Sequence, residues 1–172
     1  MASSSVWNFP MKKLDSMLLQ IFETLQKRRE TLATAESCTG GMLGEWITCI
    51  PGASRVYLGG IISYANSVKI DTLQVPKKIL EKYGAVSEPT AFYMAKGAQK
   101  ICKATWAISI TGIAGPDGGS PEKPVGTICF GIAGPAGIFT KEIRFKNLGR
   151  QKNREAAAVA ALKWFSQQIK SQ

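Results

Sequence analysis

The sequence predicts an α/β protein, a three-layer α/β/α sandwich built on a mixed β-sheet. Apolar strand-like runs alternate with amphipathic helical segments up to residue 110, which is typical of parallel strands with crossover helices. Two further runs, 125–133 and 138–145, flank a Gly-Pro-Ala-Gly turn and predict a hairpin, which adds antiparallel strands. The length of 172 residues and the hydrophobic content of 45% suit a domain with a substantial core.

The first half of the chain is expected to alternate helices with two strands. Leu14, Leu18, Ile21 and Leu25 share one face of the first helix, and Pro51-Gly52 ends the second. We expect helices over 12–27, 39–50, 67–73 and 76–83, and strands over 31–35 and 55–64.

The second half is expected to begin with a helix over 87–102 and a central apolar strand over 106–110. A long glycine- and proline-rich loop follows over 111–124, then the hairpin and a final helix over 150–169. We expect a single domain over 11–172. Residues 1–10 are expected to be a disordered arm or an expression leader, with Met11 as a natural start.

Composition excludes several kinds of chemistry. The chain has no histidine, which excludes Ser-His-Asp and Cys-His mechanisms and histidine-ligated metal sites. The four cysteines are not spaced as a zinc site or a disulfide framework, and no signal peptide or membrane span is recognisable. These features predict reduced thiols in a cytoplasmic protein.

The formal net charge of +10 favours an anionic small substrate over a cationic one. Basic clusters such as Lys27-Arg28-Arg29 could also form a nucleic-acid footprint. They lie in separate helices without interleaved aromatic residues, so we interpret them as solvated helix faces.

The join between the first strand and the second helix is the first candidate site. Such a join exposes backbone N–H groups and the positive end of a helix dipole, which suit an anion or an oxyanion. Ser37 and Thr39 place hydroxyls there, although either could simply be a helix N-cap. Cys38 is a competing nucleophile, because a thiolate is stabilised at a helix N-terminus.

A serine without a histidine can be activated by a neutral lysine, and Lys69 is the candidate, with Tyr64 as a proton relay. Both residues also fit plainer roles, as a solvated helix lysine and a half-buried strand aromatic. Arg150 and Arg154 lie one helical turn apart and could bind one phosphate, or could simply be exposed.

Five motifs together resemble the CinA C-terminal family. They are Thr34-Ala35-Glu36-Ser37-Cys38-Thr39-Gly40-Gly41, Tyr64-Ala65-Asn66-Ser67-Val68-Lys69, Gly84-Ala85-Val86-Ser87, the loop 112–119 and Glu122-Lys123-Pro124-Val125-Gly126-Thr127. The resemblance runs from about Met11 to the C-terminus. The chain resembles the stand-alone form of the family. Its characterised members include a nicotinamide-nucleotide amidase. The resemblance therefore implies hydrolysis of nicotinamide mononucleotide to nicotinate mononucleotide and ammonia, in pyridine nucleotide salvage.

The resemblance also implies site residues. Ser37 would be the nucleophile, Lys69 the base and Tyr64 an assisting hydroxyl. Thr111, Gly112 and Gly115 would line the nucleotide pocket, and Arg150 and Arg154 would bind the phosphate. From helix-terminus physics, the backbone of Thr39, Gly40 and Gly41 is the candidate oxyanion hole.

No metal or organic cofactor is implied, and a homodimer without a membrane partner is expected. The alternatives are a nucleotide-binding module without turnover and a nucleic-acid-associated accessory protein.

Overall fold

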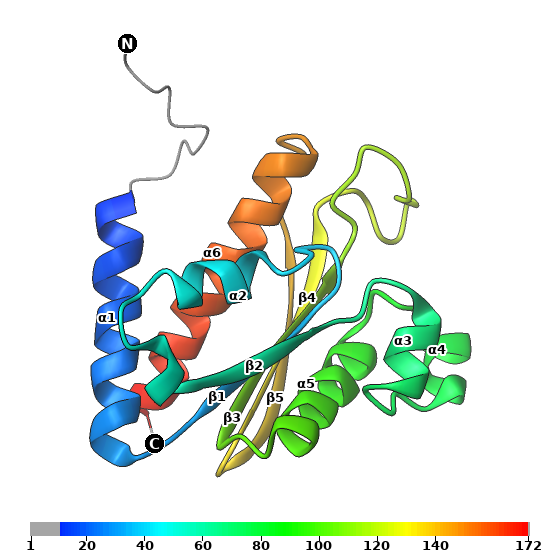
Figure 1. The fold of residues 1–172 in the computed structure, drawn as a ribbon. Coiled ribbons are helices and arrows are strands. Elements are labelled where there is room, and N and C mark those ends of the chain that lie inside the picture. The colour runs from blue at the N-terminus through cyan, green and yellow to red at the C-terminus, as the bar shows by residue number, and fades with distance from the viewer. Residues whose placement is uncertain (1–10, 172) are drawn as a thin grey trace.

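A computed structural model describes residues 11–171, which are built around one five-stranded sheet (Figure 1). The expected arm over residues 1–10 lies outside the described residues. The strand order is β2-β1-β3-β4-β5, in which β1 pairs in parallel with β2 and β3, and the pairs β3–β4 and β4–β5 are antiparallel. The mixed sheet is therefore confirmed. The elements are α1 (Met11–Arg28), β1 (Leu32–Glu36), α2 (Met42–Thr48), β2 (Tyr57–Ile62), α3 (Asn66–Asp71), α4 (Lys77–Tyr83), α5 (Glu88–Cys102), β3 (Trp106–Gly112), β4 (Thr127–Gly134), β5 (Gly137–Arg144) and α6 (Arg150–Lys170).

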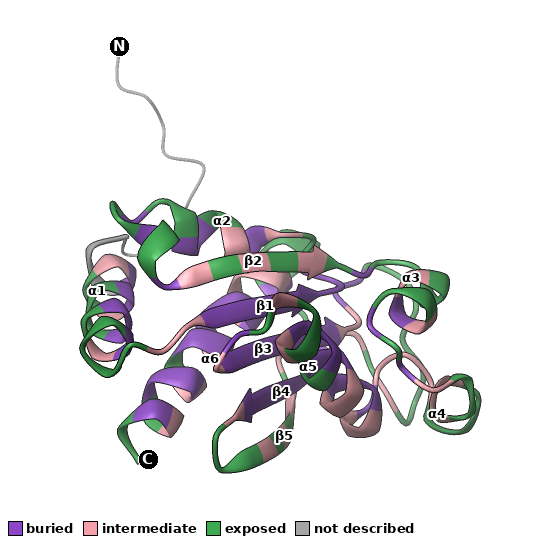
Figure 2. Ribbon diagram, turned by 60° about the horizontal axis from the view of Figure 1, so that its bottom comes forward, coloured by how far each residue is buried: buried purple, intermediate pink, exposed green. Residues whose placement is uncertain are grey.

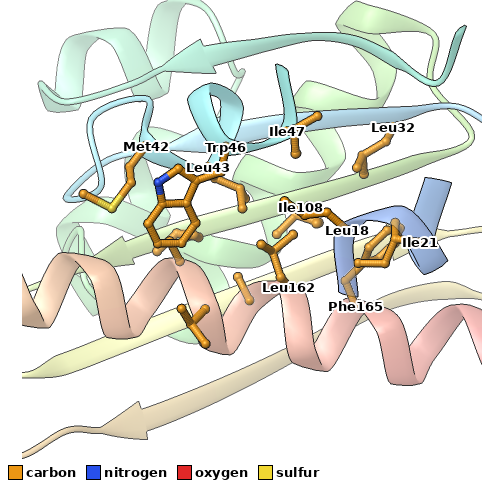
Figure 3. Packing of buried hydrophobic residues seen from close by; sticks show 14 of the residues in the cluster. Leu18, Ile21, Leu32, Met42, Leu43, Trp46, Ile47, Ile108, Leu162 and Phe165 are labelled. Carbon is orange, nitrogen blue, oxygen red and sulfur yellow. The ribbon is translucent and has the colours of Figure 1, made fainter. Parts of the chain in front are cut away.

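Helices cover both faces of the sheet, which confirms the three-layer sandwich (Figures 1 and 2). The face covered by α1, α2 and α6 carries large side chains, among them Leu32 and Ile108 on the strands, Trp46 on α2 and Phe165 on α6 (Figure 3). This interdigitated cluster is the larger of the two cores and anchors α2, the helix that follows β1 in the chain.

The opposite face of the sheet is lined by small side chains, so α5 packs close to the strands. Ala33, Ala107 and Ala133 point to this side, together with the fully buried Ser109. The Ser109 hydroxyl donates a hydrogen bond of 2.6 Å to the carbonyl of Ala91 on α5. This close contact orients the start of α5 beside the carboxyl end of β3.

The prediction of a helix from residue 39 is wrong at its start, because α2 begins at Met42. Gly40 and Gly41 have left-handed φ angles of 61° and 98°, and this conformation cannot continue a right-handed helix. Residues 37–41 therefore form a turn between β1 and α2. The strand expected over 55–64 is likewise shorter, since a 3₁₀ turn over Ala53–Arg55 precedes β2.

None of the helices within residues 11–171 combines the length and apolarity that crossing a membrane requires.

Candidate active site

The sheet places Ser37 where a ligand site is expected. Strand β1 has β2 on one side and β3 on the other, so the chain reverses its direction of winding at β1, and ligands bind outside the carboxyl ends of strands at such a reversal. The Ser37 N–H donates to the carbonyl of Ile110 (2.9 Å), and the Ser63 N–H donates to that of Glu36 (2.7 Å). These bonds extend both parallel ladders beyond β1 and fix the position of Ser37.

Lys69 projects from the short helix α3 back to the end of β1. Its Nζ donates hydrogen bonds to the Ser37 Oγ (3.1 Å), the Ser63 carbonyl (2.7 Å) and the Tyr64 carbonyl (3.3 Å). The side chain is 1% exposed, and no ion pair within residues 11–171 involves it. Burial lowers the pKa of the Lys69 ammonium, because a buried positive charge without a carboxylate is poorly solvated. The geometry brings the predicted nucleophile and base together.

Cys38, unlike its neighbour Ser37, has its side chain buried in the hydrophobic core. Its side chain is buried within the cluster beneath α2 and α6. Burial raises the pKa of the Cys38 thiol to about 12, so the thiolate that a nucleophile requires is disfavoured at neutral pH. The structure therefore favours Ser37 over Cys38.

The turn between β1 and α2 is held by a buried carboxylate that sequence reasoning did not assign. Glu36 accepts hydrogen bonds from the N–H groups of Gly41 (3.1 Å), Leu43 (3.0 Å) and Gly44 (2.9 Å). An acceptor at this position satisfies the unpaired N–H groups that begin a helix. Neither Ser37 nor Thr39 is the N-cap, and no side chain within residues 11–171 accepts a hydrogen bond from the Thr39 hydroxyl, which is buried and unpartnered.

The expected oxyanion hole is changed by these contacts. The Gly41 N–H is bound by Glu36, and the Gly40 N–H donates to the carbonyl of Ser37 (3.0 Å). Both groups are thus engaged within the protein. No oxygen within residues 11–171 accepts a hydrogen bond from the N–H of Cys38 or Thr39. The available donors of the turn are therefore those of Cys38 and Thr39.

The two arginines that were expected to share one phosphate point to different partners. Arg154 donates to the carbonyls of Cys38 (Nε, 3.1 Å) and Thr39 (Nη2, 2.8 Å), behind the turn. Arg150 donates to the Gly115 carbonyl (2.7 Å) and the Tyr64 hydroxyl (2.9 Å) and lines the candidate pocket. The geometry therefore separates the roles of the two arginines. The Tyr64 hydroxyl accepts a hydrogen bond from Arg150, and within residues 11–171 it forms none with Ser37.

The glycine-rich loop is tied to the site through its ends. Thr111 is buried and its hydroxyl donates to the Ala85 carbonyl (2.8 Å). A Cβ on Gly112 would clash with the Ile128 side chain, so close packing excludes a larger residue there. Lys123 donates to the carbonyls of Tyr83 (2.8 Å) and Val86 (2.7 Å), which holds the loop against the connector between α4 and α5.

Asn153 on α6 was not singled out from the sequence. It is fully buried, donates to the Ala114 carbonyl (3.0 Å) and accepts from the Leu148 N–H (3.2 Å). It therefore fixes the start of α6, from which Arg150 and Arg154 project.

A pocket of about 210 Å³ opens over Ser37 and Lys69. This volume is smaller than the roughly 300–1,000 Å³ of sites for drug-sized ligands, so it suits a small ring with the rest of a ligand at the rim. No carboxylate lines it, and within residues 11–171 no three His, Cys, Asp or Glu residues are grouped to hold a metal. A larger hollow of about 520 Å³ lies along α5 and contains none of the predicted site residues. The residues that line the smaller pocket, over Ser37 and Lys69, are Ser37, Cys38, Tyr64, Asn66, Lys69, Ala85, Val86, Thr111, Gly112, Ala114 and Arg150.

The fold and the site define a three-layer α/β/α protein with a buried serine–lysine pair at the carboxyl edge of a mixed sheet. Comparison with known proteins identifies the family: the model of the CinA C-terminal domain matches residues 14–169. The chain belongs to the CinA C-terminal domain family, which confirms the resemblance.

Curated relatives carry CinA names. A CinA-like protein of Synechococcus sp. (strain RCC307) is 50% identical over 131 residues, which are 76% of this chain and 31% of the relative. A CinA-like protein of Cyanothece sp. (strain PCC 7425 / ATCC 29141) is 46% identical over 156 residues, 90% of this chain and 37% of the relative. The chain thus spans about a third of the length of these relatives.

Solved structures of the same superfamily share the fold. The competence/damage inducible protein CihA from Agrobacterium tumefaciens superimposes with a TM-score of 0.87 at 36% identity, covering 94% of this chain and 96% of that one. A CinA superfamily protein from Enterobacter cloacae has a TM-score of 0.88 at 28% identity, with 98% of each chain covered.

Proposed function

We propose that this protein is an amidase that hydrolyses the carboxamide of nicotinamide mononucleotide to nicotinate mononucleotide and ammonia. The contact of 3.1 Å between the Lys69 Nζ and the Ser37 Oγ carries the proposal, because a neutral amine there can accept the serine proton. The resemblance to characterised family members supplies the substrate, and a place in pyridine nucleotide salvage follows from it.

The proposed reaction is an acyl transfer in two steps. Lys69 takes the Ser37 proton while the oxygen attacks the amide carbon, and the oxyanion is stabilised by the N–H groups of Cys38 and Thr39. The protonated lysine then gives its proton to the leaving nitrogen, and ammonia departs. Water, deprotonated by Lys69, attacks the ester, and the proton returns to Ser37 as the acid is released.

The size of the pocket supports a binding mode in which the nicotinamide ring lies inside and the phosphate lies outside. The pocket volume of about 210 Å³ suits the nicotinamide ring beside Ser37. Arg150 lies at the rim next to the exposed Tyr64, and two of its donor nitrogens are already bound to the Gly115 carbonyl and the Tyr64 hydroxyl. A guanidinium has five N–H donors, so further donors are available for a phosphate.

Product analysis in ¹⁸O-labelled water tests the proposal. The protein is incubated with nicotinamide mononucleotide, ammonia is assayed, and the nucleotide is examined by mass spectrometry. We expect equimolar ammonia and an acid product that carries one solvent oxygen in its carboxylate. Lys69→Arg should be nearly inactive, because a guanidinium cannot accept the proton. Binding of the nucleotide without any turnover would overturn the proposal and favour a binding module.

A further inference from the structure

Arg154 hydrogen-bonds to the turn between β1 and α2, which carries Ser37. Its guanidinium donates to two successive carbonyls, those of Cys38 (3.1 Å) and Thr39 (2.8 Å), and a third bond to the Gln151 side chain (3.0 Å) holds it on α6. The two contacts with carbonyls link residues more than 110 positions apart. Within residues 11–171, no carboxylate forms an ion pair with Arg154. The partners of this cation are thus two backbone carbonyls and one side-chain amide oxygen, all of them uncharged.

The peptide planes of the turn show where the opposite N–H groups point. Within residues 11–171 the one cis peptide bond is Gly115-Pro116, so the bond between Cys38 and Thr39 is trans. In a trans peptide the N–H points away from the carbonyl of the same plane. Because the Cys38 carbonyl points to Arg154, the Thr39 N–H points away from it.

The next peptide plane, between Thr39 and Gly40, also turns its carbonyl toward Arg154. The Thr39 carbonyl is bound by Arg154, and the Gly40 N–H of that plane donates to the Ser37 carbonyl at 3.0 Å. The two successive carbonyls therefore face Arg154 on α6. Of the N–H groups in the same two planes, that of Gly40 points to the Ser37 carbonyl, and that of Thr39 points away from Arg154. The Thr39 N–H has no acceptor oxygen within residues 11–171.

The charge of Arg154 also acts within the turn. Burial is the main cause that raises the pKa of the Cys38 thiol, and the nearby Arg154 is among the groups that oppose this rise. A cation bound to the carbonyl ends polarises the peptide groups and strengthens the N–H ends as donors.

We infer that Arg154 is a positioning residue that aims the Thr39 N–H at the oxyanion formed at Ser37, and is not a ligand of the substrate phosphate. This inference rests on the proposed amidase function. It replaces the expectation that Arg154 binds phosphate beside Arg150. Glu36 holds the later N–H groups of the same turn, so the turn is fixed by an anion on one side and a cation on the other.

Comparison of two substrates separates positioning from phosphate binding. Arg154→Ala is assayed with nicotinamide mononucleotide and with nicotinamide riboside, which lacks the phosphate. Loss of positioning should lower kcat for both substrates by the same factor, about 10- to 100-fold, with KM little changed. A loss confined to the mononucleotide, seen in KM, would overturn the inference and make Arg154 a phosphate ligand.

Rescue and a matched control exclude a merely structural effect. Added guanidinium ion, at concentrations too low to unfold the protein, should restore activity to Arg154→Ala by occupying the vacated position. Arg154→Lys, which keeps the charge but not the two-pronged contact, should lie between wild type and Arg154→Ala. Lys152→Gln removes one exposed positive charge from the same helix and should be unaffected. Activity of Arg154→Ala that guanidinium leaves unchanged in a folded protein would contradict the inference.

Labelling of Ser37 by a fluorophosphonate keeps the inference testable if nicotinamide compounds are not substrates. The reagent phosphonylates an activated serine hydroxyl and releases fluoride, and its P–O oxygen requires the same N–H donors. We expect Arg154→Ala to lower the labelling rate by the factor seen in kcat, and guanidinium to restore it. Labelling of Ser37 without turnover would refute the amidase proposal alone. Equal labelling rates in wild type and Arg154→Ala would refute the positioning role.

Discussion

The Nζ of Lys69 lies 3.1 Å from the Oγ of Ser37, and its two other acceptors are backbone carbonyls rather than carboxylates. Carbonyl groups orient the amine without the full charge that would hold it protonated. Burial then lowers the pKa of Lys69, which increases the fraction of neutral amine at moderate pH. This arrangement is the basis of the proposed serine–lysine mechanism.

The pH dependence of turnover should follow Lys69. Because the lysine must be neutral to act, we expect kcat/KM to rise with pH along one ionisation, with a midpoint below the usual lysine value of about 10.4. Assays above about pH 7 keep the substrate phosphate dianionic and remove its titration from the profile. A rate that falls with rising pH over this range would show that the protonated amine is the active form.

Cys38 should be dispensable and unreactive. Its buried thiol has a pKa of about 12, so Cys38→Ala should keep activity within about threefold, apart from a modest packing loss. Peptide mapping after iodoacetamide treatment should find Cys49, which is exposed, modified well before Cys38. Rapid modification of Cys38 with matching loss of activity would reopen its role as the nucleophile.

Glu36 should contribute to stability through the turn that it holds. Its carboxylate accepts three N–H groups, so Glu36→Gln should lower the free energy of unfolding by about 1–3 kcal/mol in urea titrations. Glu45→Gln is the matched control, since Glu45 is an exposed acid in the first turn of the same helix. Its effect should stay within about 0.5 kcal/mol. Equal effects of the two substitutions would argue against the capping role.

Arg150 should provide the phosphate contact. Arg150→Gln should raise KM for nicotinamide mononucleotide about 10- to 100-fold, because a charge-assisted hydrogen bond is lost, and should affect the riboside less. Steady-state kinetics on both substrates check this, with Lys152→Gln as the charge control on the same helix. An unchanged ratio between the two substrates in Arg150→Gln would place the phosphate elsewhere.

The sequence predicted the layers of the fold because the hydrophobic periodicities are strong and uninterrupted. It also indicated Ser37 and Lys69, since both lie in motifs at the ends of predicted strands. The start of α2 was missed because two left-handed glycines form a turn where the apolar spacing already looks helical.

The roles of Glu36 and Arg154 depend on contacts that spacing does not encode. Glu36 alternates onto the α2 face of β1, where its carboxylate reaches the first N–H groups of that helix. Arg154 lies one turn beyond Arg150, yet its guanidinium binds the carbonyls of Cys38 and Thr39 and does not line the pocket. Residues one turn apart on a helix usually face the same neighbour, but Arg150 and Arg154 have partners in different loops.

The rate of ammonia release from nicotinamide mononucleotide by Ser37→Ala, compared with wild type under saturating substrate, tests the central claim most directly. Circular dichroism should show that the variant is folded, because the substitution removes one small side chain. The account predicts a loss of about a thousandfold or more, since a covalent step cannot proceed without the nucleophile. Turnover by a folded Ser37→Ala protein within about tenfold of wild type would contradict it.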